Sequence, residues 1–311
     1  LQQSFPEFRG LELVGTAPEL YVRESRHIQG EYRLRMTDLM ENRDHWDAIG
    51  YGSYEVDIQS TGPGQYESGA VAMNPQAYGV PFRTLVPLEV DGMLVVGRSA
   101  SFDSLPHGSA RVVPLGMATG EAAGAAAKLA IEKGVSFREL SRSKADIEEL
   151  RARLTAQGMD LEMPEIKQPD YAKHPAYTGL LAAASMSLTY GGYDNKSFDL
   201  DGESNAQRFG YNMAGAKRVH PAAFPGNPVD AFAGLGDPAK TPLSLDQAAY
   251  TVALAAGLSV KPEEALAALE ERGWVSEETL SLVKDRAKLT NGDAFMLIRD
   301  VVAAKAGVTY S

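Results

Sequence analysis

One stretch, residues 94–134, constrains the fold of this chain more than any other. Three apolar residues, Leu94–Val96, come directly before Gly97, and a polar loop then leads into an alanine-rich and glycine-rich run over Val112–Lys133. This order predicts a short buried strand that ends at a glycine turn and is followed by a long helix.

The predicted helix carries Gly116, Gly120 and Gly124, which recur every four residues. They would form a flat face that lets another backbone or a cofactor come close. The start of the helix offers free N–H groups and a partial positive charge, which suit a phosphate or the electron-rich edge of a flavin. A tightly packed core helix without a ligand would show the same residues, so spacing alone leaves both interpretations open.

The segment over residues 94–135 closely resembles the C-terminal flavin-binding motif of FAD-dependent oxidoreductases with a glutathione-reductase-like fold, and it is most similar to bacterial proteins of that family. In this family the glycine turn lies beside the flavin ribityl chain and pyrophosphate, and the helix points its N-terminus at the ring. The resemblance therefore implies FAD as the cofactor. The positions that it implies for cofactor binding are Gly97, Arg98, Ser99, Gly108, Ser109, Val113, Pro114, Gly116 and Met117.

Three further blocks resemble the same family, in the same order along the chain. They are Val22–Tyr32, Tyr51-Gly52 with Val56-Asp57, and Pro81–Pro87, so that the resemblance covers roughly residues 10–140. The chain departs from the family in one respect, because no G-x-G-x-x-G turn for the ADP pyrophosphate occurs in it. We therefore expect this chain to be the C-terminal part of a flavoprotein and to need an upstream FAD-binding half.

The resemblance also implies substrate-side residues. Arg23, Arg26 and His27 would face the substrate, since arginine recognises carboxylates through paired hydrogen bonds, and Tyr51 would join them. Arg26 and His27 are also candidate catalytic residues. The alternative for the basic residues is an ion-pair cluster with nearby glutamates at the edge of a strand.

His107 and Arg111 are the other candidate catalytic residues. His107 could act as a general acid or base, or donate a hydrogen bond to the flavin, and Arg111 could stabilise negative charge on the reduced flavin. Each has a simpler alternative, which is to order the loop that contains it.

The composition narrows the possible partners. The formal net charge is -11, which argues against nucleic-acid binding because phosphates require clustered lysines and arginines. Absence of cysteine excludes disulfides and Cys-ligated metals, and the scattered histidines lack metal-site spacing, so we expect no metal. No apolar run reaches the roughly 20 residues of a membrane helix. These observations do not distinguish a cytoplasmic from an extracytoplasmic location.

The chain divides into three predicted regions. Residues 1–158 form the flavoprotein part, residues 159–241 are rich in proline and glycine and predict short strands and loops, and residues 242–311 are helical. The fold class is thus α+β, a partial FAD/NAD(P)-binding fold with a mixed-sheet substrate region, plus a mostly helical C-terminal region.

The helical region predicts four helices, at 245–256, 262–272, 276–286 and 292–305, with Ser244 and Ser276 as N-caps. Two segments of this region, 243–257 and 289–307, each begin with leucine and a serine or threonine, continue as an amphipathic helix and end in Ala-Gly. They are similar to S-layer homology modules, which attach bacterial proteins to cell-wall polymers; a helical cap on the flavoprotein part is the alternative.

These observations lead to two functional hypotheses. The first is an FAD-dependent oxidoreductase whose flavin accepts a hydride from a small-molecule substrate, sugar-like or carboxylated, with this chain supplying the contacts to the flavin ring and the substrate. The second is a non-catalytic module that attaches to cell-wall polymer or to a partner.

Overall fold

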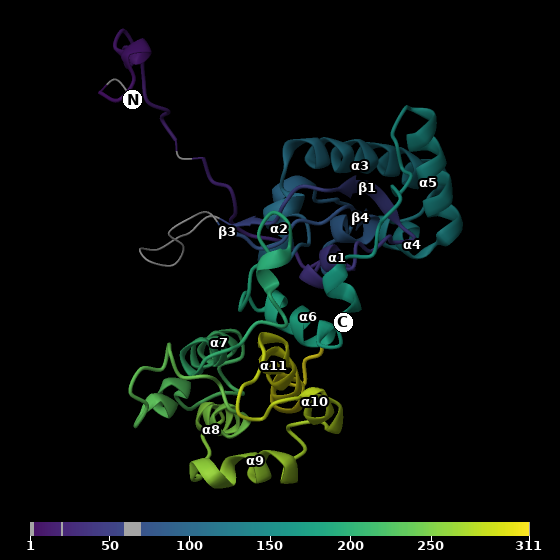
Figure 1. The fold of residues 1–311 in the computed structure, drawn as a ribbon. Coiled ribbons are helices and arrows are strands. Elements are labelled where there is room, and N and C mark those ends of the chain that lie inside the picture. The colour runs from purple at the N-terminus through teal and green to yellow at the C-terminus, as the bar shows by residue number, and fades with distance from the viewer. Residues whose placement is uncertain (1–2, 20, 59–69, 311) are drawn as a thin grey trace.

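The structure, a computed structural model, describes residues 3–19, 21–58 and 70–310. Figure 1 shows two parts that meet at α6 (Tyr177–Ser185): one in which helices surround β1 and β4, and one built from α7 to α11. The longer elements of the first part are α1 (Met36–Met40), β1 (Ala48–Gly52), β4 (Tyr78–Pro81), α2 (Ser104–Ala110), α3 (Val113–Lys133), α4 (Phe137–Arg142) and α5 (Lys144–Ala156).

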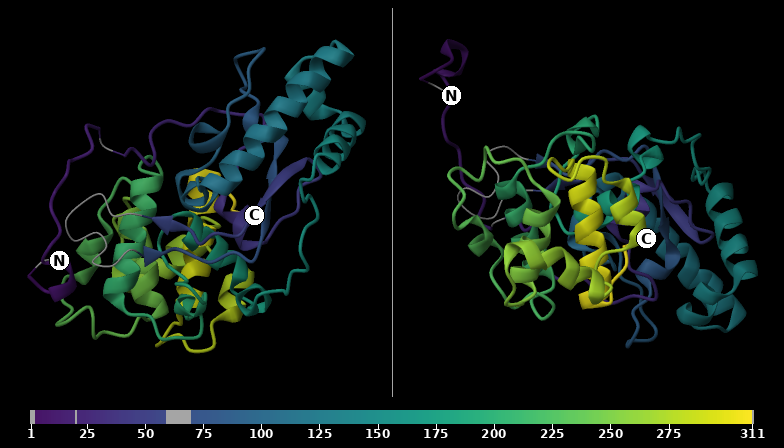
Figure 2. Two further views of the ribbon diagram at one scale, coloured as in Figure 1. Left: turned by 90° about the horizontal axis from the view of Figure 1, so that it is seen from above. Right: turned by 60° about the horizontal axis from the view of Figure 1, so that its bottom comes forward.

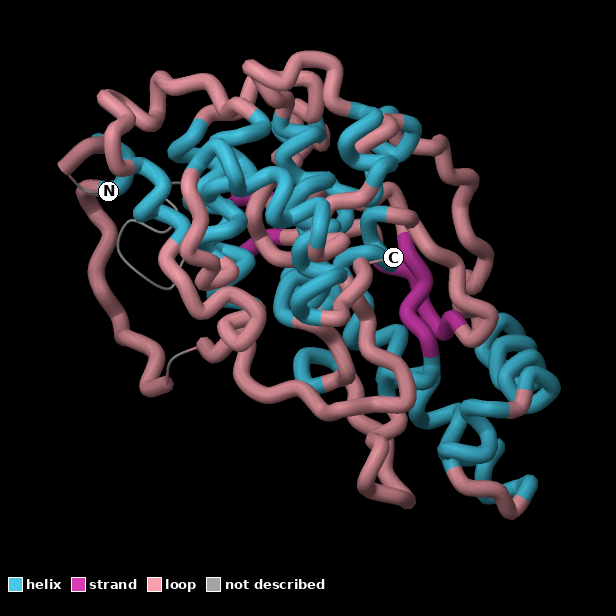
Figure 3. The backbone as a smooth tube through the Cα atoms, turned by 90° about the horizontal axis from the view of Figure 1, so that it is seen from below, coloured by secondary structure: helices cyan, strands magenta, loops and turns pink. Residues whose placement is uncertain are grey.

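The strands form two small antiparallel ribbons. β1 pairs with β4, with Tyr51 opposite Gly79, and β2 (Asp57–Ile58) pairs with β3 (Ala70–Val71). Figure 3 shows how little of the backbone is strand. Helices and a small sheet are both present, as the α+β prediction requires, but the described residues contain no larger mixed sheet.

Residues Leu94–Val96 are not the buried strand that the sequence predicts. The backbone at Val96 is extended, but among the described residues one backbone hydrogen bond, from Val95 N to Leu85 O at 2.9 Å, holds this run, and the side chain of Val96 is exposed. An apolar run becomes a buried strand only where neighbouring strands flank it, and the described part of the chain places none there.

The first part is stabilised by buried ion pairs. Asp47 is fully buried and accepts from Arg83 Nε at 2.8 Å and from the second terminal nitrogen of Arg83 at 2.9 Å. The guanidinium of Arg83 also lies over the rings of Tyr32 and Trp46. Paired bonds of this kind fix geometry as well as adding energy, so this pair joins β1 to the segment after β4.

Residues 159–241 are helical where the sequence predicts strands. α6 and α7 (Ala206–Val219) fill this region, joined by loops and short 3-10 turns, and it contains no strand beyond single bridging residues. The predicted strands are wrong at Leu180–Ala184, which is helical, is buried throughout and packs on α11 (Asn291–Ala306) and α1. Short apolar runs do not distinguish strand from helix by their pattern alone.

The C-terminal region contains the four predicted helices, although the third ends at Leu282, four residues before the predicted end. They are α8 (Leu245–Ala255), α9 (Pro262–Glu271), α10 (Glu277–Leu282) and α11. Ser244 and Ser276 act as N-caps, each accepting a backbone N–H at 3.1 Å. Among the described helices, none has the length and apolar character that crossing a membrane requires.

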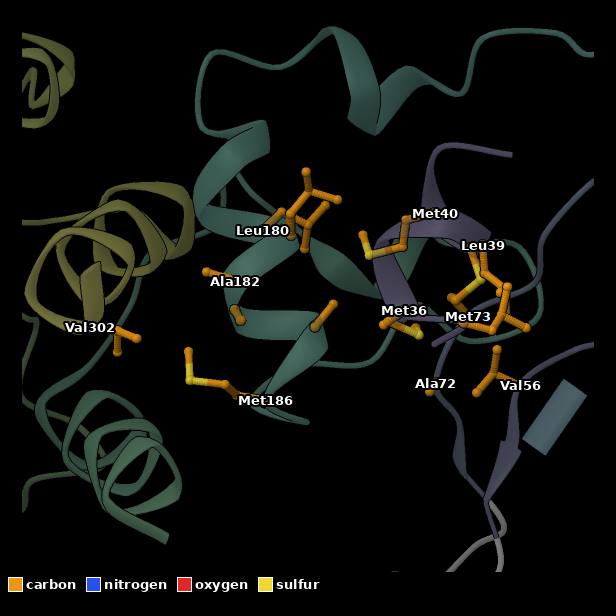
Figure 4. Packing of buried hydrophobic residues seen from close by; sticks show 14 of the residues in the cluster. Met36, Leu39, Met40, Val56, Ala72, Met73, Leu180, Ala182, Met186 and Val302 are labelled. Carbon is orange, nitrogen blue, oxygen red and sulfur yellow. The ribbon is translucent and has the colours of Figure 1, made fainter. Parts of the chain in front are cut away.

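The two parts share one hydrophobic core. Figure 4 shows Ala182 of α6, and Met186 directly after this helix, on the side toward Val302 of α11, while Leu180 lies on the side toward Met40 of α1. Views from other sides show the extended N-terminal residues projecting away from this body (Figure 2), and the side chains of residues 3–19 are exposed. α6 therefore links the helical part to the part that carries the candidate site.

Candidate functional site

The predicted glycine turn is present at Gly97. It forms a 3-10 turn, Gly97–Ser99, that lies against α3, and Gly97 has a φ of 65°, a left-handed conformation that favours glycine. Arg98 donates to Val22 O and lies over the ring of Tyr21. Ser99 O accepts from Ile28 N at 3.0 Å. The first resembling block, Val22–Tyr32, thus runs directly beside the turn.

The glycine face of α3 is open. A Cβ added at Gly116, Gly120 or Gly124 would meet no atom within 4 Å. Val113 and Met117, on the same face, are 70% and 71% exposed. The helix buries its opposite face, so the glycines do not serve close packing within the described chain. This observation favours the interpretation of the face as a surface for a ligand or another segment, over that of a core helix.

Pro114 lies in the first turn of α3, where its missing N–H costs no helical bond. The N–H groups of the remaining first-turn residues have no helical partner. Helix N-termini of this kind favour electron-rich groups. The start of α3 therefore presents donors next to an exposed apolar surface.

Gly108 and Ser109 lie inside the protein. A Cβ on Gly108 would come within 2.9 Å of Asp57 O, so glycine is required for α2 to approach β2 this closely. Ser109 is fully buried; its hydroxyl lies 2.7 Å from Tyr78 OH and donates to Tyr54 O. These two predicted cofactor positions fix α2 in place and present no surface to a ligand here.

His27 and His107 come together around Glu24. His27 Nε2 lies 3.1 Å from Glu24 Oε1, and His107 Nδ1 lies 3.8 Å from Glu24 Oε2. The two rings meet edge to face with centroids 4.7 Å apart. Glu24 is exposed while His107 is 1% exposed, so the cluster runs from the surface inward.

The hydrogen bonds define where protons lie in this cluster. His27 Nδ1 is 3.2 Å from Ala100 O, which can only accept, so Nδ1 carries a proton. The contact between His27 Nε2 and Glu24 Oε1 then needs a proton of its own, because an unprotonated ring nitrogen and a carboxylate oxygen both accept. Burial lowers the pKa of His107 to about 4, and its Nε2 has no hydrogen-bond partner among the residues that the structure describes. His107 is therefore neutral at pH 7.

Arg23 and Arg111 both bind Asp57. Their terminal nitrogens lie 3.4 Å and 3.3 Å from Asp57 Oδ2. Arg111 thus anchors α2 to β2, as the simpler alternative for it stated. Arg26 is exposed and does not enter the cluster, and no hydrogen bond or ion pair joins its side chain to another described residue.

Tyr51 lies apart from this cluster. It lines a pocket of about 790 Å³ with Met117 at the start of α3, and its hydroxyl donates to Asp44 at 3.0 Å. The pocket thus brings one predicted substrate residue beside one predicted cofactor residue. Acidic residues, among them Glu121 and Glu162, also line it.

Glu24, His27 and His107 also place one possible ligand atom each within 4.8 Å of one another, a donor set that zinc accepts. The histidine spacing along the sequence predicts no metal. His27 and His107 come together only in the folded chain, so their spacing could not indicate a shared site. Arg111 and Arg98 face His107 and disfavour positive charge there. The same charges oppose a bound cation, which favours a hydrogen-bonded acid–base cluster.

Two important residues, Glu24 and Asp57, are absent from the predicted site. Both lie inside the resembling blocks, and the ion-pair alternative considered for Arg23 and His27 could have identified Glu24. The partner of Arg23 and Arg111 is Asp57, however, which only the pairing of β2 with β3 and the packing of α2 bring into place.

Comparison with known proteins supports the flavoprotein interpretation of this part. Residues 1–154 match the family model described as FAD dependent oxidoreductase, and FAD is the cofactor that this family implies. The match ends within α5, so the helices from α6 onward lie outside it. Searches of curated proteins and of solved structures found no match.

Proposed function

We propose that this chain forms the flavin-ring and substrate side of the active site of an FAD-dependent oxidoreductase, which transfers a hydride from a small-molecule substrate to FAD. The observation that carries the proposal is the open start of α3 beside the Gly97 turn. A glutathione-reductase-like arrangement of the flavin relative to these two elements is part of the proposal.

The residues at this place suit a flavin ring. Val113 and Met117 offer exposed apolar surface, and Gly116 adds no side chain that would obstruct a flat ring. The free N–H groups of the first turn suit the pyrimidine carbonyls. Gly97 and Ser99, in the turn packed against α3, would lie along the ribityl chain.

FAD, when bound, supplies the hydride acceptor. Oxidation of an alcohol or amine also releases a proton from oxygen or nitrogen, and the chain needs a group to accept it. We assign this role to the exposed carboxylate of Glu24, which His27 Nε2 contacts at 3.1 Å and holds in place. His107 packs behind His27 and limits its ring to one orientation.

Arginines set the charge of the site. Arg23 and Arg111 are neutralised in part by Asp57, whereas Arg98 binds a backbone carbonyl and an aromatic ring and keeps its charge. A carboxylated or polyhydroxylated substrate fits such a surface better than a cationic one. Arg26, exposed in the same segment, would meet the substrate from solvent.

The ADP half of FAD has no matching turn in this sequence, which lacks G-x-G-x-x-G. We therefore propose that this chain recognises mainly the flavin ring, and that a separate FAD-binding half completes the site. On this basis riboflavin and FAD should bind the chain with similar affinity.

A titration of flavin fluorescence tests the proposal. Riboflavin and FAD should each be quenched saturably by the chain, and Met117→Asp should weaken binding by about tenfold or more, the effect of losing roughly 1.4 kcal/mol. Ile131→Asp is the matched control, since Ile131 is 82% exposed at the other end of the same helix. Absence of saturable quenching, or equal loss in both variants, would contradict the proposed site.

Turnover tests the acid–base assignment. With a panel of sugars and hydroxy acids and an artificial electron acceptor, Glu24→Gln should lower kcat by about 100-fold, the lower end of general-base contributions. Glu12→Gln, an exposed glutamate of the N-terminal segment, is the control. Equal kcat in the two variants would remove Glu24 from the mechanism.

A second candidate function concerns the C-terminal helices. α8 and α11 both begin at a hydroxyl N-cap, Ser244 or Thr290, and both are followed by a left-handed glycine, Gly257 or Gly307. This shared design supports the proposed similarity to S-layer homology modules. Sedimentation of the chain with purified cell-wall polymer tests it: retention supports attachment, and a chain that stays in the supernatant contradicts it.

A further inference from the structure

A second cavity lies at the boundary between the two parts of the chain. Its volume is about 570 Å³, within the range of small-molecule sites. The segment before α1, the start of α2, the end of α6, the end of α7 and the C-terminal residues 308–310 all contribute to its wall. The cavity is distinct from the flavin-facing end of α3, whose residues do not line it.

Three arginines give this cavity a positive charge. Arg33 is paired with Asp103 at 2.5 Å. Arg35 and Arg218 also line the cavity, and neither side chain has an ion-pair partner among the described residues. Among the described lining residues, one carboxylate thus accompanies three guanidinium groups. In a chain with a net charge of -11, such a local excess of positive charge is unusual.

Two hydroxyl groups in the wall have no hydrogen-bond partner in the described part of the chain. Thr37, 2% exposed, and Ser185 both line the cavity, and the Oγ atoms of both are buried and unpartnered. Buried polar atoms normally have a partner, so each such atom needs an explanation. The rest of the wall includes Met36 and Met186, which give it an apolar side.

We propose that this cavity binds a small organic anion, with its carboxylate held by Arg35 and Arg218 and its carbon skeleton against Met36 and Met186. Guanidinium groups recognise carboxylates through charge-assisted, often bidentate bonds. Thr37 and Ser185, whose Oγ atoms are buried at the wall, would add hydrogen bonds to the same ligand after rotation of their side chains. This inference does not depend on the proposed flavin site.

The cavity is connected to the acid–base cluster through α2. Ser104 and Leu105 line the cavity, and His107 lies one turn further along the same short helix. A ligand held there would contact the helix that positions His107. The cavity is therefore placed to sense an organic anion close to the proposed active site.

Methyl NMR on the full chain tests the proposal, because the cavity contains its own reporters. With 13C-methyl methionine labelling, Met36→Leu and Met186→Leu identify the two cavity signals. Succinate, benzoate and inorganic phosphate are added at constant ionic strength. Succinate or benzoate should shift both signals saturably and leave Met163, which lines a different pocket, unchanged.

The variant Arg35→Gln/Arg218→Gln should weaken that binding by about tenfold or more, because it removes two charge-assisted contacts. Arg272→Gln is the control, since Arg272 is exposed on the helical part and outside the cavity. The methionine spectrum of each variant also reports whether it is folded.

Three outcomes would overturn the proposal: no saturable shift with either organic anion, equal affinity in the double variant and the control, or binding of phosphate alone. Saturable binding of the organic anions that only the double variant loses would establish the site. Because the readout involves no flavin, failure here leaves the proposed oxidoreductase function standing.

Discussion

The part of the chain around β1 and β4 and the C-terminal helices are stabilised in different ways. In the first, buried polar groups join segments far apart in sequence, such as Asp47 with Arg83 and Asp57 with Arg23 and Arg111. In the second, capped amphipathic helices such as α8 and α11 pack on one another with few buried charges. Candidate chemistry lies in the region with the long-range polar contacts, whereas helix packing, N-caps and a local polar cluster of Asp300 with Ser276 and Arg299 support the other region.

The largest difference between the two regions should appear when a buried ion pair is broken. Asp47→Ala leaves the guanidinium of Arg83 without its partner, and removing one member of a buried pair costs about 3–5 kcal/mol. Urea unfolding, followed by circular dichroism, measures the change in the free energy of unfolding.

Asp246→Ala is the matched control in the helical region, because Asp246 lies exposed in the first turn of α8. Its loss should cost about 0.3–1 kcal/mol. Equal effects of the two substitutions would contradict the contrast drawn between the regions.

Acid should lower the free energy of unfolding through the protonation of His107. Because burial lowers the pKa of His107 from 6.5 to about 4 in the folded chain, the unfolded chain binds the proton first as pH falls. The free energy of unfolding therefore keeps this contribution in full above pH 6.5 and loses it between pH 6.5 and 4. The expected loss is about 2 kcal/mol, which is less than the whole shift would give because part of the shift comes from charges that solvent screens.

Urea unfolding from pH 7.5 to 4 measures this dependence. His107→Gln should flatten the profile in that window, since glutamine does not titrate. An unchanged slope in the variant would show that His107 is not held neutral by burial.

Two glycines should respond in opposite directions to alanine. Gly108→Ala should destabilise the chain by about 1–2 kcal/mol, because the new methyl group meets Asp57 O and Ile58 Cδ1 at 2.9 Å. Gly120→Ala should stabilise it by about 0.5–1 kcal/mol, because nothing lies within 4 Å and alanine favours a helix. Thermal unfolding measures both; destabilisation by Gly120→Ala would mean that the open face of α3 is covered.

A small effect is also expected at a helix cap. Ser244→Ala removes the acceptor for Gln247 N and should cost about 1 kcal/mol. Ser281→Ala, an exposed serine of α10, is the control and should change stability by less than about 0.5 kcal/mol. A cost at Ser281 as large as that at Ser244 would show that capping does not explain the stability of this region.

This contrast also explains what could be predicted from the sequence. The C-terminal helices and their caps follow from local spacing, and the glycine turn and helix over residues 97–133 follow from a recognisable motif. Asp57 was not predicted as a site residue because folding alone brings Arg23 and Arg111 to it, whereas Glu24 lies three residues from His27 and belongs to the ion-pair alternative. The strands expected in residues 159–241 were wrong, because an apolar run such as Leu180–Ala184 has no local feature that separates helix from strand.

The central claim is that a flavin ring lies at the start of α3 beside the Gly97 turn. Photolabelling with 8-azidoriboflavin, followed by peptide mass spectrometry, tests it most directly. The account predicts that the label attaches within residues 93–117 and that excess riboflavin prevents this. Labelling confined to the C-terminal helices, or labelling that riboflavin does not reduce, would contradict it.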